Sequence, residues 1–327
     1  MGRYIWLIVV IGLGAIVPVW GQNLKFDSAG HFKIVQFTDV HYVPNNPKSK
    51  AAIHLIEKVL DLENPDLVVL TGDIVTGRPA RIGWDSVLDP ILRRNIPFIV
   101  TLGNHDDEQD LSRRQVAELV TSYPLNLNTV RVDSVTGYLN GVFPVLGHLS
   151  DKPALLLYGL DSNSYSSIQA IKGYAWFTPD QIECYNLWSR YYTGLNGGKP
   201  IPALAFFHIP LPEYRVAYNI RENRQSGKRR EKECAPELNT GMYAAMLLNG
   251  DVMGMGMFTG HDHGNDYIAL YNGIALAYGR FSGGKTTYTK TSNGARVIEI
   301  REGVRGFSSY IRLSNGKIVD VYDYKQN

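Results

Sequence analysis

The apolar positions of this chain recur with two different periods in turn. Short runs rich in β-branched and aromatic residues, such as FKIVQFTD at 32–39, predict buried strands. Stretches with apolar residues three and four apart, such as AAIHLIEKVLDLE at 51–63, predict amphipathic helices. The two kinds alternate: strands are expected at 32–39, 66–73, 96–106, 154–162, 202–210 and 252–263, and helices at 51–63, 84–94, 112–122, 178–192 and 239–250.

The C-terminal part follows a different pattern. The stretches 266–279, 295–303 and 308–324 favour strands, and turn signals such as Asn315-Gly316 leave no room for helices between them. A β/α alternation that ends in consecutive strands predicts a layered α/β domain whose last strands pair antiparallel. Because no internal repeat or low-complexity linker interrupts the chain, we expect one domain over residues 22–327.

Residues 1–21 are predicted to be a signal peptide that is not part of this domain. Arg3 precedes an apolar run that continues to about Val19, and the small residue Gly21 stands just before Gln22. The run is too short for a comfortable membrane-spanning helix, and no cysteine directly follows it that a lipid could modify. We therefore expect a periplasmic or secreted mature chain that begins near Gln22 and does not associate with a membrane. An uncleaved N-terminal anchor is the alternative.

Composition and charge fit a globular domain without a polyanionic partner. Of the 327 residues, 44% are hydrophobic and 20% are charged, which is enough apolar material to bury a large core. With 33 basic and 31 acidic residues the formal net charge is +2, so nothing global indicates nucleic acid or an anionic membrane surface. One basic-rich run lies at 221–233. A solvated loop is the favoured interpretation of this run, and a phosphate-steering rim is the alternative.

The chain has two cysteines, Cys184 and Cys234, and therefore one possible disulfide. Export to an oxidising compartment would permit this bond. We expect Cys184 to lie on a helix and Cys234 at the end of the charged run, so that a bridge would tether the run to the domain. Two free thiols are the alternative.

Side chains of metal-binding type follow five of the expected strands. They are Asp39 and His41 in FTDVHY, Asp73 in LTGDIV, Asn104, His105 and Asp106 in LGNHDD, His208 in FFHIP, and His261 and His263 in FTGHDH. Taken singly, an aspartate after a strand usually forms a turn, and a lone histidine usually packs in a core. In open α/β sheets, however, ligands bind beyond the carboxyl ends of the strands, so five such clusters would converge on one site.

The number of donor groups indicates more than one ion. Seven protein groups are too many for one transition metal and suit two ions that share a bridging carboxylate. The expected donors are Asp39, His41, Asp73, Asn104, His208, His261 and His263. The run GLDSNSY, which contains residues 161–165, could also line the cleft, although a turn explains it equally well.

These motifs in this order resemble the calcineurin-like metallophosphoesterase family over about residues 32–301. The surrounding segments VVLTGD, TLGNHD, FFHIPLPEY and FTGHDHGNDY are similar to the purple acid phosphatase-like branch of plants (type 29) and yeast (the dosage-regulator kind). The resemblance implies a four-layer α/β/β/α sandwich, with two sheets face to face and helices outside them.

The resemblance also implies how the donors are shared. One ion is held by Asp39, His41, Asp73 and His263, and the other by Asp73, Asn104, His208 and His261, with Asp73 as the bridge. His105 lies beside the ions without binding them, and Asp106 orients it.

Two positions depart from the purple enzymes. Thr76 stands where those enzymes have the tyrosine that binds ferric iron, and His41 stands where they have glycine. We therefore expect a colourless site that holds two divalent ions, manganese, zinc or iron.

The function that follows is hydrolysis of small phosphate monoesters by a metal-activated hydroxide, with His105 as the general acid that protonates the leaving group. A role for His105 in positioning the substrate phosphate is the alternative. A phosphodiesterase or nucleotide hydrolase would use the same site, and a non-catalytic scaffold is the alternative outside the enzymes.

Overall fold

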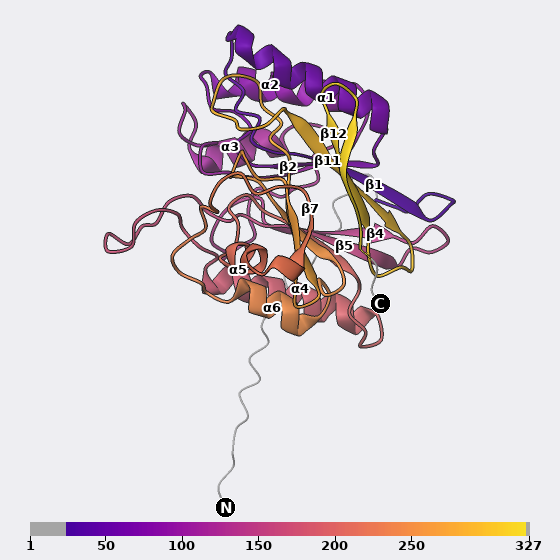
Figure 1. Ribbon diagram of the computed structural model, residues 1–327. Helices are drawn as coiled ribbons and strands as arrows, with labels where there is room; N and C mark the ends of the chain where they lie inside the picture. The colour runs from indigo at the N-terminus through magenta and orange to yellow at the C-terminus, as the bar shows by residue number, and fades with distance from the viewer. Residues whose placement is uncertain (1–23, 325–327) are drawn as a thin grey trace, which may run out of the picture.

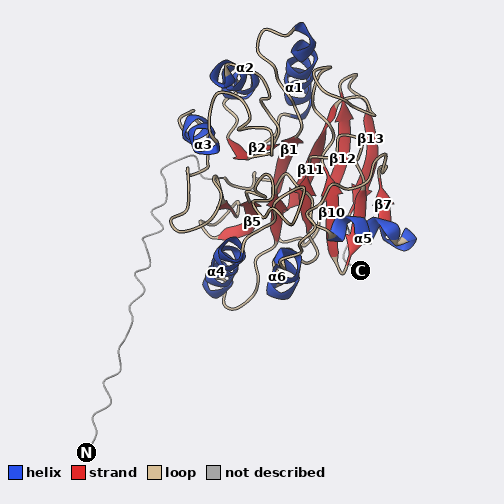
Figure 2. Ribbon diagram, turned by 90° about the vertical axis from the view of Figure 1, so that its left-hand side faces the viewer, coloured by secondary structure: helices blue, strands red, loops and turns tan. Residues whose placement is uncertain are grey.

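Two β-sheets pack face to face, and helices cover the outer face of each sheet (Figures 1 and 2). The computed structural model describes residues 24–324, so the predicted signal peptide lies outside the described residues. The four layers confirm the predicted sandwich.

The first sheet has six strands in the order β13-β12-β11-β1-β2-β3. Strands β1, β2 and β3 run parallel, as β/α alternation requires, whereas β11, β12 and β13 pair antiparallel. Their bounds are β1 (His31–Phe37), β2 (Leu67–Thr71), β3 (Phe98–Thr101), β11 (Gly294–Arg301), β12 (Ser308–Leu313) and β13 (Ile318–Asp323).

The second sheet has seven strands in the order β4-β5-β6-β8-β10-β9-β7. Its centre, β5 to β10, is parallel, and the outer strands are antiparallel. The bounds are β4 (Gly141–Leu146), β5 (Pro153–Gly159), β6 (Ala203–Phe206), β7 (Arg224–Ser226), β8 (Gly256–Thr259), β9 (Ile268–Tyr271) and β10 (Ile274–Tyr278).

The helices form the outer layers. Those over the six-stranded sheet are α1 (Lys50–Glu63), α2 (Ala80–Leu92) and α3 (Arg113–Thr121). Those over the seven-stranded sheet are α4 (Pro179–Leu195), α5 (Glu213–Asn219) and α6 (Met242–Asn249). Short 3-10 turns are η1 (Pro47–Ser49) and η2 (Arg221–Asn223). Ser112 and the predicted cap Thr178 each begin a helix with a capping box.

Alternation along the strands builds the core. In β2, Val68 and Leu70 face the helices α1–α3, while Leu67 and Val69 face the second sheet. Because both faces are covered, the strand reads as a continuous apolar run. A third apolar layer, which includes Tyr185, lies between the second sheet and its helices.

Three elements were not predicted: β4, α5 and β7. Strands β4 and β7 lie at the two edges of their sheet and are only partly buried, so neither has a strong apolar signal. Helix α5 has seven residues, which are too few for a clear period. The expected strand at 252–263 is limited to the four residues of β8.

The expectation of a disulfide between Cys184 and Cys234 is wrong. Cys184 is buried on α4, Cys234 is exposed, and both are free thiols. The chain at Cys234 is held instead by a hydrogen bond from its amide to Asp262 Oδ1 at 3.1 Å.

None of the helices within residues 24–324 is long and apolar enough to cross a membrane.

Candidate metal centre

Each expected donor lies just beyond the carboxyl end of a strand, where the chain turns sharply. Asp39, His41, Asp73 and His261 all have left-handed backbones, with φ of 53°, 46°, 54° and 78°. This conformation is uncommon for residues other than glycine, and such strain concentrates at functional sites. The loops therefore place polar side chains at this edge at a cost in backbone energy.

Two glycines let these loops approach one another closely. A side chain at Gly103 would overlap the carboxylate and amide of Asp73, and one at Gly260 would overlap Thr38 and Asp39. Each of these glycines directly precedes an expected donor, Asn104 and His261. Only glycine therefore lets the donors of different strands meet.

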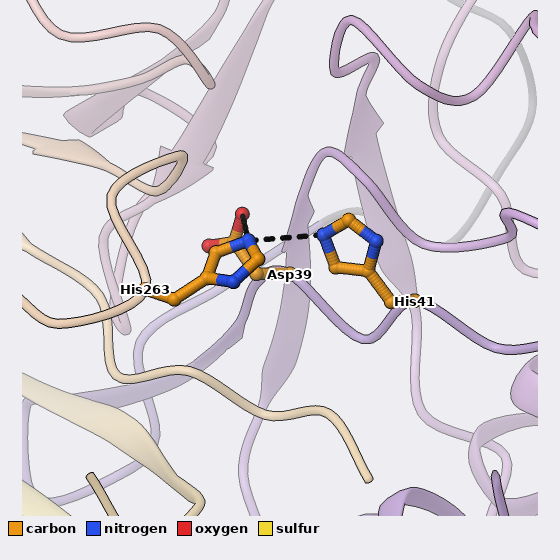
Figure 3. A group of neighbouring side chains, drawn as sticks. All are labelled: Asp39, His41 and His263. Carbon is orange, nitrogen blue, oxygen red and sulfur yellow. Dashed lines mark hydrogen bonds and ion pairs between the residues drawn. The ribbon is translucent and has the colours of Figure 1, made fainter. Parts of the chain in front are cut away.

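The first group of donors consists of Asp39, His41 and His263 (Figure 3). All three are buried, and one ligand atom from each lies within 4.8 Å of the others. His263 Nδ1 donates to the carbonyl of Tyr288 at 2.8 Å, so its Nε2 carries the lone pair. His263 Nε2 lies 3.0 Å from His41 Nε2 and 3.6 Å from Asp39 Oδ1. A shared cation would suit this arrangement.

The second group consists of Asp73, His208 and His261, again all buried. His208 Nδ1 donates to the carbonyl of Thr71 at 2.8 Å, which leaves Nε2 free to face Asp73 Oδ2 at 3.2 Å. The same Asp73 oxygen lies 3.6 Å from His41 Nε2 of the first group. Asp73 thus lies between the two groups, where a bridging carboxylate belongs.

Unpartnered buried atoms show that these residues fit metal ions. His261 Nε2 and Asn104 Oδ1 are buried and have no hydrogen-bond partner within residues 24–324. Leaving such atoms unpaired costs about 1–3 kcal/mol each. Imidazole nitrogen and amide oxygen are both atoms that divalent ions bind, and the amide nitrogen of Asn104 already donates elsewhere.

Burial also tunes the charges of the site. It lowers the pKa of His41 to about 3 and that of His261 well below its usual value, so both imidazoles are neutral. Burial opposes ionisation of Asp73, but His208 outweighs it and holds the pKa of Asp73 well below its usual range. Burial lowers the pKa of His208, but the carboxylate of Asp73 outweighs burial and raises that pKa to about 9. A divalent ion in place of this proton would supply the positive charge that offsets the buried carboxylate.

His105 lies beside the first group, with its ring centroid 5.7 Å from that of His41. Its Nδ1 lies 2.5 Å from Glu108 Oε2, and it is only half-buried. Burial lowers the pKa of His105, but the carboxylates of Asp73 and Glu108 outweigh burial, and the net pKa is raised. Glu108 was missed by the sequence reasoning, although its spacing of three from His105 was a usable signal.

Asp106 does not orient the ring of His105, contrary to expectation. Its two oxygens accept hydrogen bonds from the amides of Asp73, Ile74, Val75 and Gly103 at 2.8–3.2 Å. A fully buried carboxylate that gathers four amides fixes the loop after β2 against the loop after β3. Asp106 is therefore a support beneath the donors.

The charged run at 221–233 is not simply a solvated loop. Residues 228–234, which comprise the end of this run and Cys234, hydrogen-bond to the loop that carries His261 and His263. Asn265 Oδ1 accepts from the amides of Arg230 and Glu231 at 2.9 and 3.2 Å. We name residues 228–234 the bracing segment, because they hold the loop in place.

The fold and the site together define the class of protein. The family description of the calcineurin-like phosphoesterases matches residues 32–265, and the chain belongs to this family. The predicted resemblance is therefore confirmed.

Two relatives show that, within this family, the chain is similar to the purple acid phosphatase-like branch. The chain is similar to probable inactive purple acid phosphatase 29 of Arabidopsis thaliana, with 31% identity over 83% of this chain and 78% of that protein. It is also similar to phosphatase DCR2 of Saccharomyces cerevisiae, with 32% identity over 94% of this chain and 58% of the yeast protein.

A solved structure with the same fold is a dimetal phosphatase from Danio rerio. It has a TM-score of 0.62 and 13% identity and covers 90% of this chain and 99% of that one. At this identity the likeness shows the shared fold.

Proposed function

We propose that this protein is an exported phosphatase that hydrolyses small phosphate monoesters at two divalent metal ions. The observation that carries the proposal is the pair of buried donor groups with Asp73 between them. Membership of the calcineurin-like phosphoesterases supports the same activity, as does the phosphatase named among the relatives.

The donors would divide between the two ions as follows: Asp39, His41, Asp73 and His263 for one, and Asp73, Asn104, His208 and His261 for the other. When bound, such ions supply a hydroxide near neutral pH and neutralise charge on the phosphate oxygens. The chain fixes the donors through hydrogen bonds to backbone carbonyls. His105 donates the proton to the departing alcohol: Glu108 occupies its Nδ1, which leaves Nε2 for the leaving oxygen.

The donor set also bears on which metals are used. Thr76 supplies no phenolate, and its amide is engaged with the carbonyl of Tyr42 at 3.0 Å. A site built from imidazole, carboxylate and amide groups suits manganese, zinc or ferrous iron. The protein should therefore be colourless.

A working enzyme is favoured over a binding scaffold. Three plant relatives carry the words "probable inactive" in their names. A scaffold has no need to keep buried, strained donors in place, yet all seven expected donors and His105 are present here.

The test is metal analysis of the purified chain together with assays on an aryl phosphate and an aryl phosphodiester. We expect about two metal equivalents and turnover of the monoester. Asp73→Asn should abolish both, whereas Asp133→Asn, which changes an exposed carboxylate, should keep both. Turnover of the diester alone would replace the monoester assignment with a phosphodiesterase. Bound metal without activity on a broad ester panel would favour the scaffold.

Export has a separate test. Expression of the full chain with its first 21 residues should release a product whose mass corresponds to a chain that begins at Gln22. A cell-associated product that retains Met1 would instead indicate an uncleaved anchor.

A further inference from the structure

A chain of hydrogen bonds connects Asn104 to His105 through two side chains outside the donor set. Asn104 Nδ2 donates to the hydroxyl of Tyr165 at 3.0 Å, and this hydroxyl donates to Glu108 Oε1 at 2.9 Å. The other oxygen of Glu108 lies 2.5 Å from His105 Nδ1. One tyrosine hydroxyl thus touches both an expected metal donor and the support of the expected acid.

The directions of these bonds leave one consistent arrangement. The carboxylate of Glu108 can only accept, so the single hydroxyl hydrogen of Tyr165 is committed to it. The oxygen of that hydroxyl can then only accept from Asn104. The amide nitrogen must therefore face Tyr165, because the opposite orientation would bring two acceptors together.

This orientation determines which atom of Asn104 is left without a partner and available to a metal ion. Its Oδ1 is turned away from Tyr165, is buried, and has no hydrogen-bond partner within residues 24–324. Amide oxygen binds divalent cations, whereas an amide NH2 group does not. Without the hydroxyl, nothing in this chain of bonds would select the oxygen-inward orientation over the flipped one.

We propose that Tyr165 is a positioning residue of the metal centre, which turns the amide oxygen of Asn104 toward the second ion and holds Glu108 against His105. The ring of Tyr165 is 46% exposed and stacks on Tyr174 at a centroid distance of 5.8 Å. The role therefore belongs to the hydroxyl rather than to core packing. This inference rests on the proposed two-metal centre.

The first test is metal titration of Tyr165→Phe against the wild type, with Mn²⁺ or Zn²⁺ added to chelator-treated protein. Phenylalanine keeps the ring and removes the hydroxyl. We expect one of the two sites to weaken by about 10–100-fold, the usual effect of losing an outer-shell partner, while the other site keeps its affinity. The matched control is Tyr174→Phe, which keeps the ring that packs on Tyr165 and His261 and removes a hydroxyl that takes no part in the bonds from Asn104 to His105.

A double-mutant cycle separates orientation from general damage. In Asn104→Asp both terminal atoms are oxygens, so no hydroxyl is needed to choose between them. Tyr165→Phe should therefore have little effect on metal affinity in the Asn104→Asp background. An equal loss in both backgrounds would mean that Tyr165 merely supports its loop.

The outcomes also separate this inference from the proposed function. Two ions bound with equal affinity by wild type and Tyr165→Phe would overturn the role of Tyr165 and leave the metal centre standing. Wild-type protein that binds no divalent ion would overturn the metal centre itself, and this inference with it.

Discussion

Asp106 is the buried residue on which the loops after β2 and β3 depend, because four amides donate to its two oxygens. In Asp106→Asn one oxygen becomes an NH2 group that faces amide donors. We expect the free energy of unfolding to fall by about 2–4 kcal/mol, since charged hydrogen bonds are lost and donors are left unpaired. Urea denaturation in the presence of chelator measures this without a contribution from metal. A fall below about 0.5 kcal/mol would contradict the supporting role.

His105 should show its role through the leaving group. A general acid matters most for an alcohol that leaves poorly, so His105→Ala should lower kcat for an alkyl phosphate by about 10²–10⁴-fold. For an aryl phosphate with an acidic phenol the loss should be much smaller. Equal losses for both substrates would mean that His105 positions the phosphate and does not donate a proton. Glu108→Gln, which keeps the shape of the partner, tests whether the effect depends on its charge.

Asp180 gives a pH-dependent contribution to stability away from the metal centre. It lies in the first turn of α4, and its Oδ2 accepts from the amide of Thr136 at 2.6 Å. Burial opposes ionisation, but the hydrogen bonds from Thr178 and Thr136 together outweigh it and lower the pKa to about 2. Because the folded-state pKa lies below the unfolded value of 3.8, the stabilisation is complete above about pH 5. It declines as the pH falls toward 2.

Asp180→Asn should therefore cost about 1 kcal/mol at pH 7, a modest figure because solvent screens this partly exposed site. At pH 3 the difference from wild type should shrink to about half. Denaturation at both pH values measures it, and Asp133→Asn should show no difference at either. A cost that is independent of pH would show that the ionised carboxylate is not responsible.

At the scale of elements, the bracing segment joins the charged run at 221–233 to the loop of His261 and His263. Asn265→Ala removes the side-chain oxygen that accepts hydrogen bonds from two amides of the bracing segment, those of Arg230 and Glu231. We expect the basic residues of this segment to become several times more sensitive to trypsin, because local opening exposes them. Asn315→Ala, which removes an acceptor from an exposed turn, is the control and should leave this cleavage unchanged. Unchanged cleavage in Asn265→Ala would mean that the ion pair of Arg230 with Asp266 suffices.

Much of the architecture could be predicted because the strands that carry donors are buried and read as apolar runs. The positions of Asp39 and Asp73 relative to their strands follow directly from such patterns. The contact of Tyr165 with Glu108 could not be found in this way, since the two residues lie 57 positions apart and meet only through the path of two loops. The edge strands β4 and β7 were missed because half-exposed residues have no obligatory pattern.

At the scale of the whole molecule, the donors come from both sheets. The loops after β1, β2 and β3 carry Asp39, His41, Asp73 and Asn104, and those after β6 and β8 carry His208, His261 and His263. The two ions would therefore connect the sheets at one end of the sandwich. The donors lie together only in the folded chain, so the ions bind the folded state and not the unfolded one. Occupancy of the two sites therefore stabilises the fold.

Removal of metal should thus lower the midpoint temperature of thermal unfolding, because the ions connect the two sheets. With each ion at about 100 times its dissociation constant, the two sites add about 5 kcal/mol, which is on the order of 10 °C for a chain of this size. Calorimetry with and without chelator measures this shift. Asp73→Asn should lose nearly all of it, because the shared carboxylate serves both ions, whereas loss of Asn104 should remove only about half. A chelator shift that survives Asp73→Asn would place the stabilising ions elsewhere and separate them from the site proposed for catalysis.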